Sequence, residues 1–187
     1  MLLDCQNPGE LRVNMLDYLK VVLEDLPEVI TGRSTSTTAN ILFQVRPEYK
    51  EPHLNKETAT AFHHTVAQLI FVTSSSRKDT NMAIDFLCTQ VRIPDENEWG
   101  KLVRVLRYIR GTLHMPLILR AYSLSVIQWS VDVYFSAQSY CKGHTGAMMS
   151  MGSGSIIELS WKQKINGRSS TESKIFGDDD VLTQCLW

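Results

Sequence analysis

Asp132 is one of two acidic side chains in this sequence whose surroundings suggest metal chemistry. It stands between two valines in the apolar segment Gln-Trp-Ser-Val-Asp-Val-Tyr-Phe-Ser, residues 128–136. Aspartate is disfavoured in strands and costly to bury without a partner, so the residues alone favour the solvent face of a half-exposed strand. The alternative is that Asp132 supplies a hard oxygen ligand for Mg²⁺ in the middle of a sheet.

Glu172 is the second candidate. It follows the hydroxyl cluster 169–171 in the stretch Lys-Gln-Lys-Ile-Asn-Gly-Arg-Ser-Ser-Thr-Glu-Ser-Lys, residues 162–174. One of these hydroxyls can cap a helix, and an acid in the first helical turn is favoured by the helix dipole. The residues alone therefore favour a structural role, with a metal ligand as the alternative. The later run Asp178–Asp180 is no substitute partner, because Asp179 lies about 10 Å from Glu172 along a helix.

A third set of residues could bind a polyanion. In the helix expected after Pro94, apolar residues form one stripe and three arginines occupy the opposite arc, with a lysine at its edge; these basic residues are Lys101, Arg104, Arg107 and Arg110. No acid occurs between residues 99 and 120. The surface is either an ordinary solvated face or a track for a phosphate backbone.

The first two thirds of the chain read as mainly helical. A strand is expected over 11–15, followed by a helix that ends at Pro27 and a long connector loop over 31–57. Three helices follow. The first ends at the serine run 74–76, the second extends to Val91, and the third has an Asp95/Glu98 capping box and ends near Gly111.

The last third reads as three strands and a helix. Strands are expected over 124–135, 145–151 and 155–162, with a hairpin turn at Gly152–Gly154, and a helix over 170–186. On that helix, the expected buried face is Ile175, Phe176, Leu182 and Leu186. The fold class is therefore α+β, with divisions at 1–57, 58–115 and 120–187.

Composition narrows the class of protein. The net charge of −1 excludes a globally basic nucleic-acid-binding chain, so any electrostatic surface has to be local. The four cysteines are far apart without a CxxC spacing, which favours reduced thiols inside a cell. No signal peptide and no apolar run of membrane-spanning length is present. We expect an intracellular protein, cytoplasmic or nuclear, with no membrane partner.

The order of these strands and helices, and the residues around Asp132 and Glu172, resemble those of a known family. The segment from Val131 to Ser173 contains a Val-Asp strand, a Gly-His-Thr-Gly hairpin, a Lys-Gln-Lys strand end and a Ser-Ser-Thr-Glu helix start. With these motifs it resembles the ribonuclease H part of copia-type retrotransposon Pol polyproteins. Upstream, the segments 62–91 and 99–112, the latter containing Arg-Tyr-Ile-Arg-Gly-Thr, resemble the region after the polymerase palm in the same polyprotein. Residues 11–25 resemble the tail of the palm itself. The resemblance covers nearly the whole chain.

The resemblance implies that successive segments of the chain correspond to different parts of the polyprotein. It makes residues 1–57 a palm tail with a connector, residues 58–115 a thumb or connection segment, and residues 120–187 a truncated ribonuclease H-like unit. Asp132 and Glu172 would be the first two carboxylates of a two-metal nuclease site holding Mg²⁺. The partner would be an RNA–DNA hybrid, and the arginine surface would follow its backbone. The parent element assembles in cytoplasmic virus-like particles.

The same resemblance implies that both catalytic centres are incomplete. The family nuclease uses at least two more acids on a later strand and helix, and the paired aspartates of the polymerase would lie before residue 1. Lys174 and Asp178 also depart from the family pattern. One interpretation is a reverse transcriptase/ribonuclease H fragment that is inactive alone and can associate with the remaining Pol segments. The alternative is a non-enzymatic nucleic-acid-binding or interaction module derived from such an element. Whether the chain is an enzyme is left open.

Overall fold

The computed structural model describes residues 1–26, 30–32, 52–135 and 143–185, except for the side chains of residues 184 and 185. The fold is mixed α+β, as the sequence predicts. Described residues up to Ile118 belong to one compact unit, and those from Leu119 onward belong to a second. Most of the predicted connector 31–57 lies outside the described residues. Among the described helices, none combines the length and apolar character needed to cross a membrane.

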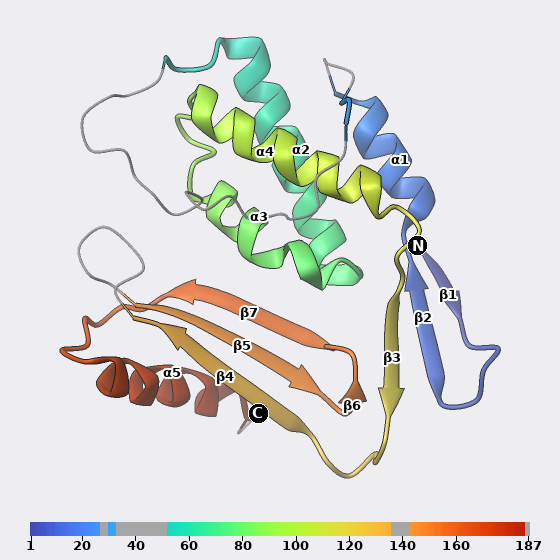
Figure 1. Ribbon diagram of the computed structural model, residues 1–187, viewed down its shortest axis with the longest axis vertical. Helices are drawn as coiled ribbons and strands as arrows, with labels where there is room; N and C mark the ends of the chain where they lie inside the picture. Colours follow the sequence, from blue (N-terminus) through green and yellow to red (C-terminus); the bar gives the residue numbers. More distant parts are fainter. Residues whose placement is uncertain (27–29, 33–51, 136–142, 186–187) are drawn as a thin grey trace. The chain divides into compact units, whose positions relative to one another are not determined.

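The first unit opens with a β-hairpin and continues with helices (Figure 1). Strands β1 and β2 are antiparallel, with Leu3 opposite Val13, and Gly9 makes the turn between them with φ +76°. A left-handed φ of this kind favours glycine. The elements are β1 (Leu2–Asp4), β2 (Glu10–Asn14), α1 (Leu16–Glu24), α2 (Lys56–Ser75), the 3₁₀ turn η1 (Lys78–Thr80), α3 (Asn81–Cys88) and α4 (Glu96–Gly111).

The core of the first unit is built from the apolar stripes that the helical periodicity predicts. The stripe on α4 is fully buried, and α2 contributes a second one; the residues are Phe62, Val66, Leu69, Leu102, Val105, Leu106 and Ile109. Burial of this much apolar surface is the main stabilising term for such a helical unit. Helix α3 is shorter than predicted, because it ends at Cys88 and leaves Val91 outside it.

Helix α4 begins and ends where local chemistry predicts. The Asp95 carboxylate accepts hydrogen bonds from the backbone N–H groups of Asn97 and Glu98 at 2.8 and 3.0 Å. The Glu98 side chain reaches back to the backbone N–H of Asp95 at 3.2 Å, which completes the capping box. The helix ends at Gly111, as predicted.

The second unit contains an antiparallel sheet of three strands in the order β4-β5-β7. In register, Asp132 of β4 lies opposite Gly146 of β5, and Gly146 lies opposite Ser160 of β7. The elements are β3 (Leu117–Ala121, which crosses the boundary between the units), β4 (Gln128–Tyr134), β5 (His144–Ser150), β6 (Gly152–Ser153), β7 (Ile157–Lys162) and α5 (Ser170–Cys185).

Two strand predictions in the second unit are wrong in detail. Strand β4 begins at Gln128, so residues 124–127 lie outside it, and β3 was not predicted. Strands β5 and β7 form the predicted hairpin, but Gly152 and Ser153 in its connection also pair with β3 as the short strand β6, with Gly152 opposite Ala121. The cross-strand pairing satisfies backbone groups that a turn would leave to solvent.

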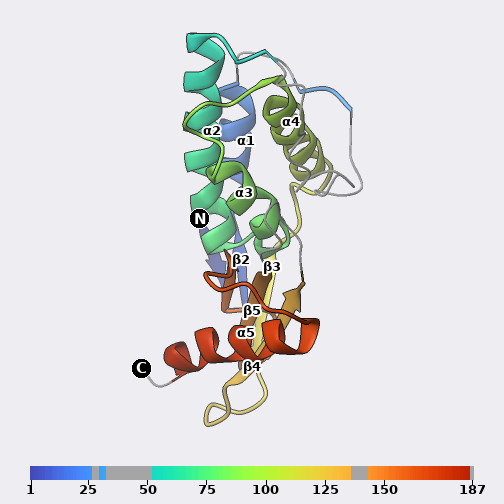
Figure 2. The ribbon, with the colours of Figure 1, turned by 90° about the vertical axis from the view of Figure 1, so that its left-hand side faces the viewer.

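Helix α5 lies along one face of this sheet (Figures 1 and 2). The predicted buried face is wrong for Ile175 and Leu182, which are 61% and 56% exposed. Phe176 is half-buried, and Leu186 lies outside the described residues. The buried positions are instead Ser173, Gly177 and Val181, which recur every four residues. Small side chains on this stripe let the helix approach the sheet closely. A Cβ at Gly177 would lie only 2.5 Å from Val133 Cγ2.

Candidate functional site

Asp132 lies on the exposed face of β4. Its carboxylate accepts a hydrogen bond from the backbone N–H of Val133 at 2.9 Å, and the residue is exposed, whereas Val133 is buried. Its cross-strand partner Gly146 has no side chain, and a Cβ there would meet only the Asp132 carbonyl oxygen, at 3.9 Å. The carboxylate therefore faces an open part of the sheet, which agrees with the solvent-face interpretation of the sequence.

Glu172 acts within the first turn of α5. Its backbone N–H donates to Ser169 Oγ at 3.2 Å, and its carboxylate accepts from the backbone N–H of Arg168 at 2.6 Å. This pattern resembles a capping box displaced by one residue, and it satisfies donors that the helix start leaves unpaired. The described contacts of Glu172 are those of an acidic residue that stabilises the first turn of a helix.

Asp132 points away from the helix that carries Glu172. Helix α5 packs against Val133, and side chains alternate between the two faces along a strand, so Asp132 points to the face opposite α5. Within the described ranges, no group of three or more His, Cys, Asp or Glu side chains is placed to hold a metal ion. In this arrangement the residues do not fit the predicted shared Mg²⁺, which prefers several converging oxygen ligands.

The three acids after Glu172 do not complete a site either. Asp178 and Asp179 are exposed on α5. Asp180 is half-buried and accepts a hydrogen bond from Trp161 Nε1 at 3.2 Å, which ties the helix to β7. Asp180 thus has a packing role that the sequence did not indicate.

Gln163 is the centre of a buried polar cluster in the second unit. It is 1% exposed, and its Nε2 donates to Thr145 Oγ1 at 3.0 Å and to the backbone oxygen of Ser173 at 2.8 Å. Its own backbone N–H donates to the carbonyl of Gly143 at 2.9 Å. One side chain therefore joins three segments: the Gly-His-Thr-Gly strand, the Lys-Gln-Lys strand end and the start of α5.

Two glycines make room for this cluster. A Cβ at Gly143 would overlap Gln163 Oε1, and a Cβ at Gly167 would overlap Ser173 Oγ. Thr145 and Ser173 are both fully buried. The Nε2 end of the amide holds its two acceptors in place, because displacing it would leave them without their donor. Gln163 Oε1 and Ser173 Oγ are buried and have no hydrogen-bond partner among the described residues.

His144 belongs to the open face with Asp132. Its Nε2 lies 2.8 Å from Ser160 Oγ, and burial lowers the pKa of the imidazole, which favours the neutral ring near pH 7. The sequence singled out the Gly-His-Thr-Gly motif without predicting the serine partner. Cross-strand register is the missing information, since Ser160 is sixteen positions away.

Lys101 is not part of an accessible basic surface. Its side chain is 4% exposed, its Nζ lies 3.5 Å from Glu98 Oε1, and the same Nζ lies 4.7 Å from the centre of the Phe86 ring. Burial raises the pKa of the Glu98 carboxyl, and neighbouring Asp95 raises it further. The Lys101 ammonium, which the sequence placed on the phosphate-binding surface, is therefore enclosed by an acid and an aromatic ring in this structure.

Three arginines remain on that surface of α4. Arg107 and Arg110 are exposed, and Arg104 is half-buried. Arg107 Nε donates to the carbonyl of Thr31 at 3.0 Å, and Arg110 Nη1 donates to the carbonyl of Ile30. Arg104 Nε is buried with no hydrogen-bond partner among the described residues. The predicted arginine arc thus exists, and two of its members are tied to one short segment.

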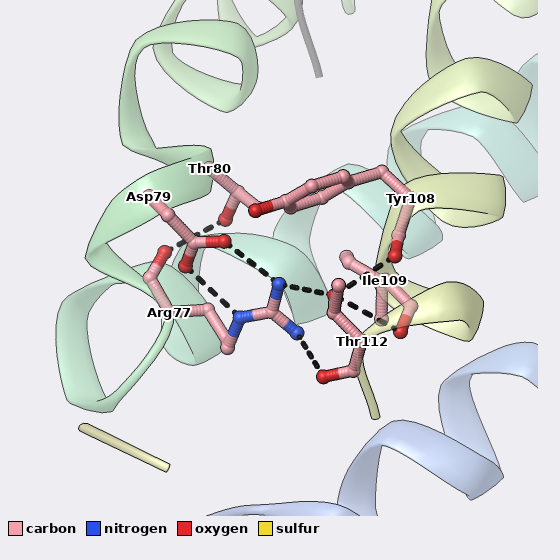
Figure 3. A network of polar contacts seen from close by, with 6 residues as sticks. All are labelled: Arg77, Asp79, Thr80, Tyr108, Ile109 and Thr112. Carbon is pink, nitrogen blue, oxygen red and sulfur yellow. Dashed lines mark hydrogen bonds and ion pairs between the residues drawn. The ribbon is translucent and has the colours of Figure 1, made fainter. Parts of the chain in front are cut away.

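Arg77 forms a buried ionic network that the sequence did not predict (Figure 3). It is 1% exposed, and it donates to both carboxylate oxygens of Asp79. It also donates to the carbonyl oxygen of Thr112 at 3.2 Å and to the Thr112 hydroxyl at 2.7 Å. Its guanidinium lies 5.4 Å from the centre of the Tyr108 ring. The end of α2 is thereby connected to the end of α4.

The Arg77 network sets the ionisation of its members. Burial alone would raise the pKa of Asp79, but the hydrogen bonds and charge of Arg77, with a hydrogen bond from Tyr108, outweigh it and lower that pKa. Burial and the Asp79 carboxylate raise the pKa of Tyr108. A signal for this network was available in the sequence, because Tyr108 and Thr112 belong to the Arg-Tyr-Ile-Arg-Gly-Thr block.

No protein-family model matches the chain, and no solved structure matches it at a significant level.

Proposed function

We propose that this chain is part of a copia-type retrotransposon Pol protein and that it binds an RNA–DNA hybrid. In this proposal the second unit is the opening part of a ribonuclease H-like domain, and the first unit comes from the polymerase region. The chain would contribute binding surface and would neither cut RNA nor extend a primer alone. In this proposal the chain associates with the remaining Pol segments, which supply the catalytic residues that it lacks.

The cluster around Gln163 is the observation that carries this proposal. Two of the motifs on which the resemblance rests are separate in the sequence, yet Thr145 of Gly-His-Thr-Gly and Gln163 of Lys-Gln-Lys meet through a hydrogen bond. Gln163 also donates to the backbone oxygen of Ser173, the residue that follows Ser-Ser-Thr-Glu. Residues that depend on one another in this way constrain each other's identity. This contact explains why the motifs occur together, and it supports treating them as a single inherited structural unit.

The first unit offers parallel support. Tyr108 and Thr112 of the Arg-Tyr-Ile-Arg-Gly-Thr block both contact the buried Arg77 guanidinium. The same block carries Arg107 and Arg110, which are exposed. A block with buried structural members and exposed basic members suits a helix that presents charge to a polyanion.

A second candidate function is favoured by the arginines alone. A non-enzymatic module that binds nucleic acid through Arg104, Arg107 and Arg110 needs no metal site. The position of Asp132 on the face opposite α5 favours this function over a nuclease. The two candidates share the binding surface and differ in whether other Pol segments join the chain.

Binding to labelled nucleic acids tests the proposal. Fluorescence anisotropy would compare an RNA–DNA hybrid, single-stranded RNA and duplex DNA at two salt concentrations. We expect affinity for the hybrid that falls steeply as salt rises, because phosphate contacts release counterions. Equal affinity for all three ligands would favour the general binding module. No binding to the hybrid at low salt would contradict both candidates.

A further inference from the structure

Two consecutive carbonyl groups bind two arginines that lie one turn apart on α4. The carbonyl of Ile30 accepts from Arg110, and the carbonyl of Thr31 accepts from Arg107 at 3.0 Å. The two arginines are separated by about 4.5 Å along the helix axis. The partner segment is far away in sequence, so tertiary structure alone brings these groups together.

The carbonyl pair is itself held at both ends. The Ile30 side chain is 7% exposed and anchors the segment in the core. Gly32 follows Thr31 with φ +80°, a left-handed conformation that other residues adopt only with strain. The buried Ile30 side chain and the turn at Gly32 together orient both carbonyl groups toward α4.

Within the part of the chain that the structure describes, each arginine keeps most of its donors after this contact. A guanidinium has five N–H donors, and the carbonyl occupies one of them. Arg107 donates to its carbonyl through Nε, so its two terminal nitrogens can still donate to a ligand. Arg110 donates through Nη1, so the edge formed by its Nε and Nη2 can still donate to a ligand. Either edge can bind phosphate oxygens through two parallel hydrogen bonds. Both residues are exposed, so a phosphate can reach them.

We propose that the Ile30–Gly32 segment positions Arg107 and Arg110 for binding the phosphate backbone of an RNA–DNA hybrid. This inference rests on the proposed function and names the two arginines and the backbone segment that prepare its binding surface. Flexible arginines lose rotamer freedom when they bind, and carbonyls that already hold them reduce that loss. The residues of the segment act through the arginines and do not contact the ligand.

Gly32→Ala is the variant that separates positioning from charge. It strains the left-handed turn and leaves every charge in place. Gly9→Ala is the matched control, because Gly9 has φ +76° in the same unit, and at neither glycine would an added Cβ have a heavy atom within 4 Å. Anisotropy with a labelled hybrid would give the affinity and its dependence on salt, and thermal unfolding would verify that both variants are folded. Arg107→Gln/Arg110→Gln measures the charge contribution directly.

We expect Gly32→Ala to weaken hybrid binding by roughly tenfold with an unchanged salt slope, and Gly9→Ala to leave the affinity unchanged. The double glutamine variant should weaken binding and reduce the salt slope by about 2. Normal affinity in Gly32→Ala together with loss in the double variant would overturn the positioning role and leave the proposed function intact.

A second variant covers the case in which Gly32→Ala does not fold. Arg107→Lys keeps the charge and removes the planar fork. We expect weaker binding with the wild-type salt slope, and full wild-type affinity would overturn the inference. If the wild-type chain does not bind the hybrid at all, the proposed function fails, and this inference fails with it.

Discussion

Arg77 and Asp79 form a two-point ion pair, in which Nε and Nη2 of the arginine donate to separate carboxylate oxygens at 2.9 and 2.7 Å. The guanidinium is almost completely buried. A buried charge is tolerated when its partners satisfy its donors, and here Asp79 and Thr112 do so. Asp79 is more open, with 28% of its side chain exposed, so the pair is buried only at its Arg77 end.

Asp79→Asn should lower the free energy of unfolding by about 3 kcal/mol, because it leaves the buried guanidinium without its counter-charge. Urea denaturation followed by circular dichroism at pH 7 would measure the change. Asp17→Asn is the control, since Asp17 is 99% exposed and lies 3.8 Å from Lys20. That surface pair should contribute less than about 1 kcal/mol. Equal effects of the two substitutions would contradict the assignment of an ion pair buried at its Arg77 end.

The contribution of Asp79 should depend on pH. Its folded-state pKa is lowered, so the stability that it provides is present above the unfolded pKa of about 4 and is lost as the pH falls through the folded value. The difference in unfolding free energy between wild type and Asp79→Asn should shrink below about pH 4. Denaturation midpoints measured between pH 7 and pH 2.5 would show this, and a constant difference would argue against it.

Gly177→Ala should destabilise the second unit. Alanine is the better helix former, but its Cβ would lie 2.5 Å from Val133 Cγ2, and overpacking of this kind costs about 1–3 kcal/mol. Gly100→Ala on α4 is the matched control, because a Cβ there meets nothing within 4 Å. It should stabilise its helix by about 0.5–1 kcal/mol. Amide hydrogen exchange would measure both effects locally, and protection gained in both helices would refute the close packing of α5.

Gln163→Leu should destabilise the second unit by about 2 kcal/mol. Leucine has a similar volume, but it leaves the Ser173 carbonyl and the Thr145 hydroxyl without the donor that Gln163 provides. Gln128→Leu is the control, since Gln128 is exposed on β4. Hydrogen exchange at the start of α5 would report the difference. Unchanged protection there in Gln163→Leu would remove the main support for treating the three motifs as one structural unit.

The purified chain should neither cut RNA in an RNA–DNA hybrid nor extend a primer when Mg²⁺ is added. Asp132 points away from α5, the helix that carries Glu172, and Mg²⁺ gives up its water reluctantly without several converging oxygens. Electrophoresis of a labelled hybrid would detect cleavage, with Asp132→Asn as the control. Metal-dependent cleavage that disappears in this variant would show that a complete site forms and would contradict our interpretation.

Local chemistry was enough to predict α4. Its apolar stripe repeats with helical spacing, Asp95 and Glu98 lie three residues apart at its start, and Gly111 lies at its end. Each signal acts within a few residues, so no distant partner is needed to interpret it. The alternating segments of β5 and β7 were predictable for the same reason.

The buried face of α5 could not be predicted from neighbouring residues in the sequence. The expectation that the large apolar side chains Ile175 and Leu182 point inward fails, because the sheet approaches the helix at Gly177 and admits only small side chains there. Burial is decided by the shape of the opposing surface as well as by apolar character. That surface comes from Val133 and Thr145, which lie more than thirty residues earlier.

The roles of the charged residues also depended on contacts across the fold. Lys101 and Arg107 are both basic residues on α4, yet one is enclosed by Glu98 and Phe86 and the other is exposed beside Thr31. Likewise, side chains alternate between the two faces along β4, so Asp132 points away from α5. The sequence had suggested that Asp132 and Glu172 bind one metal ion together. Residue type defines which chemistry a side chain can perform. The direction in which the folded backbone points that side chain defines its partners, and this direction depends on packing between segments that are distant in sequence.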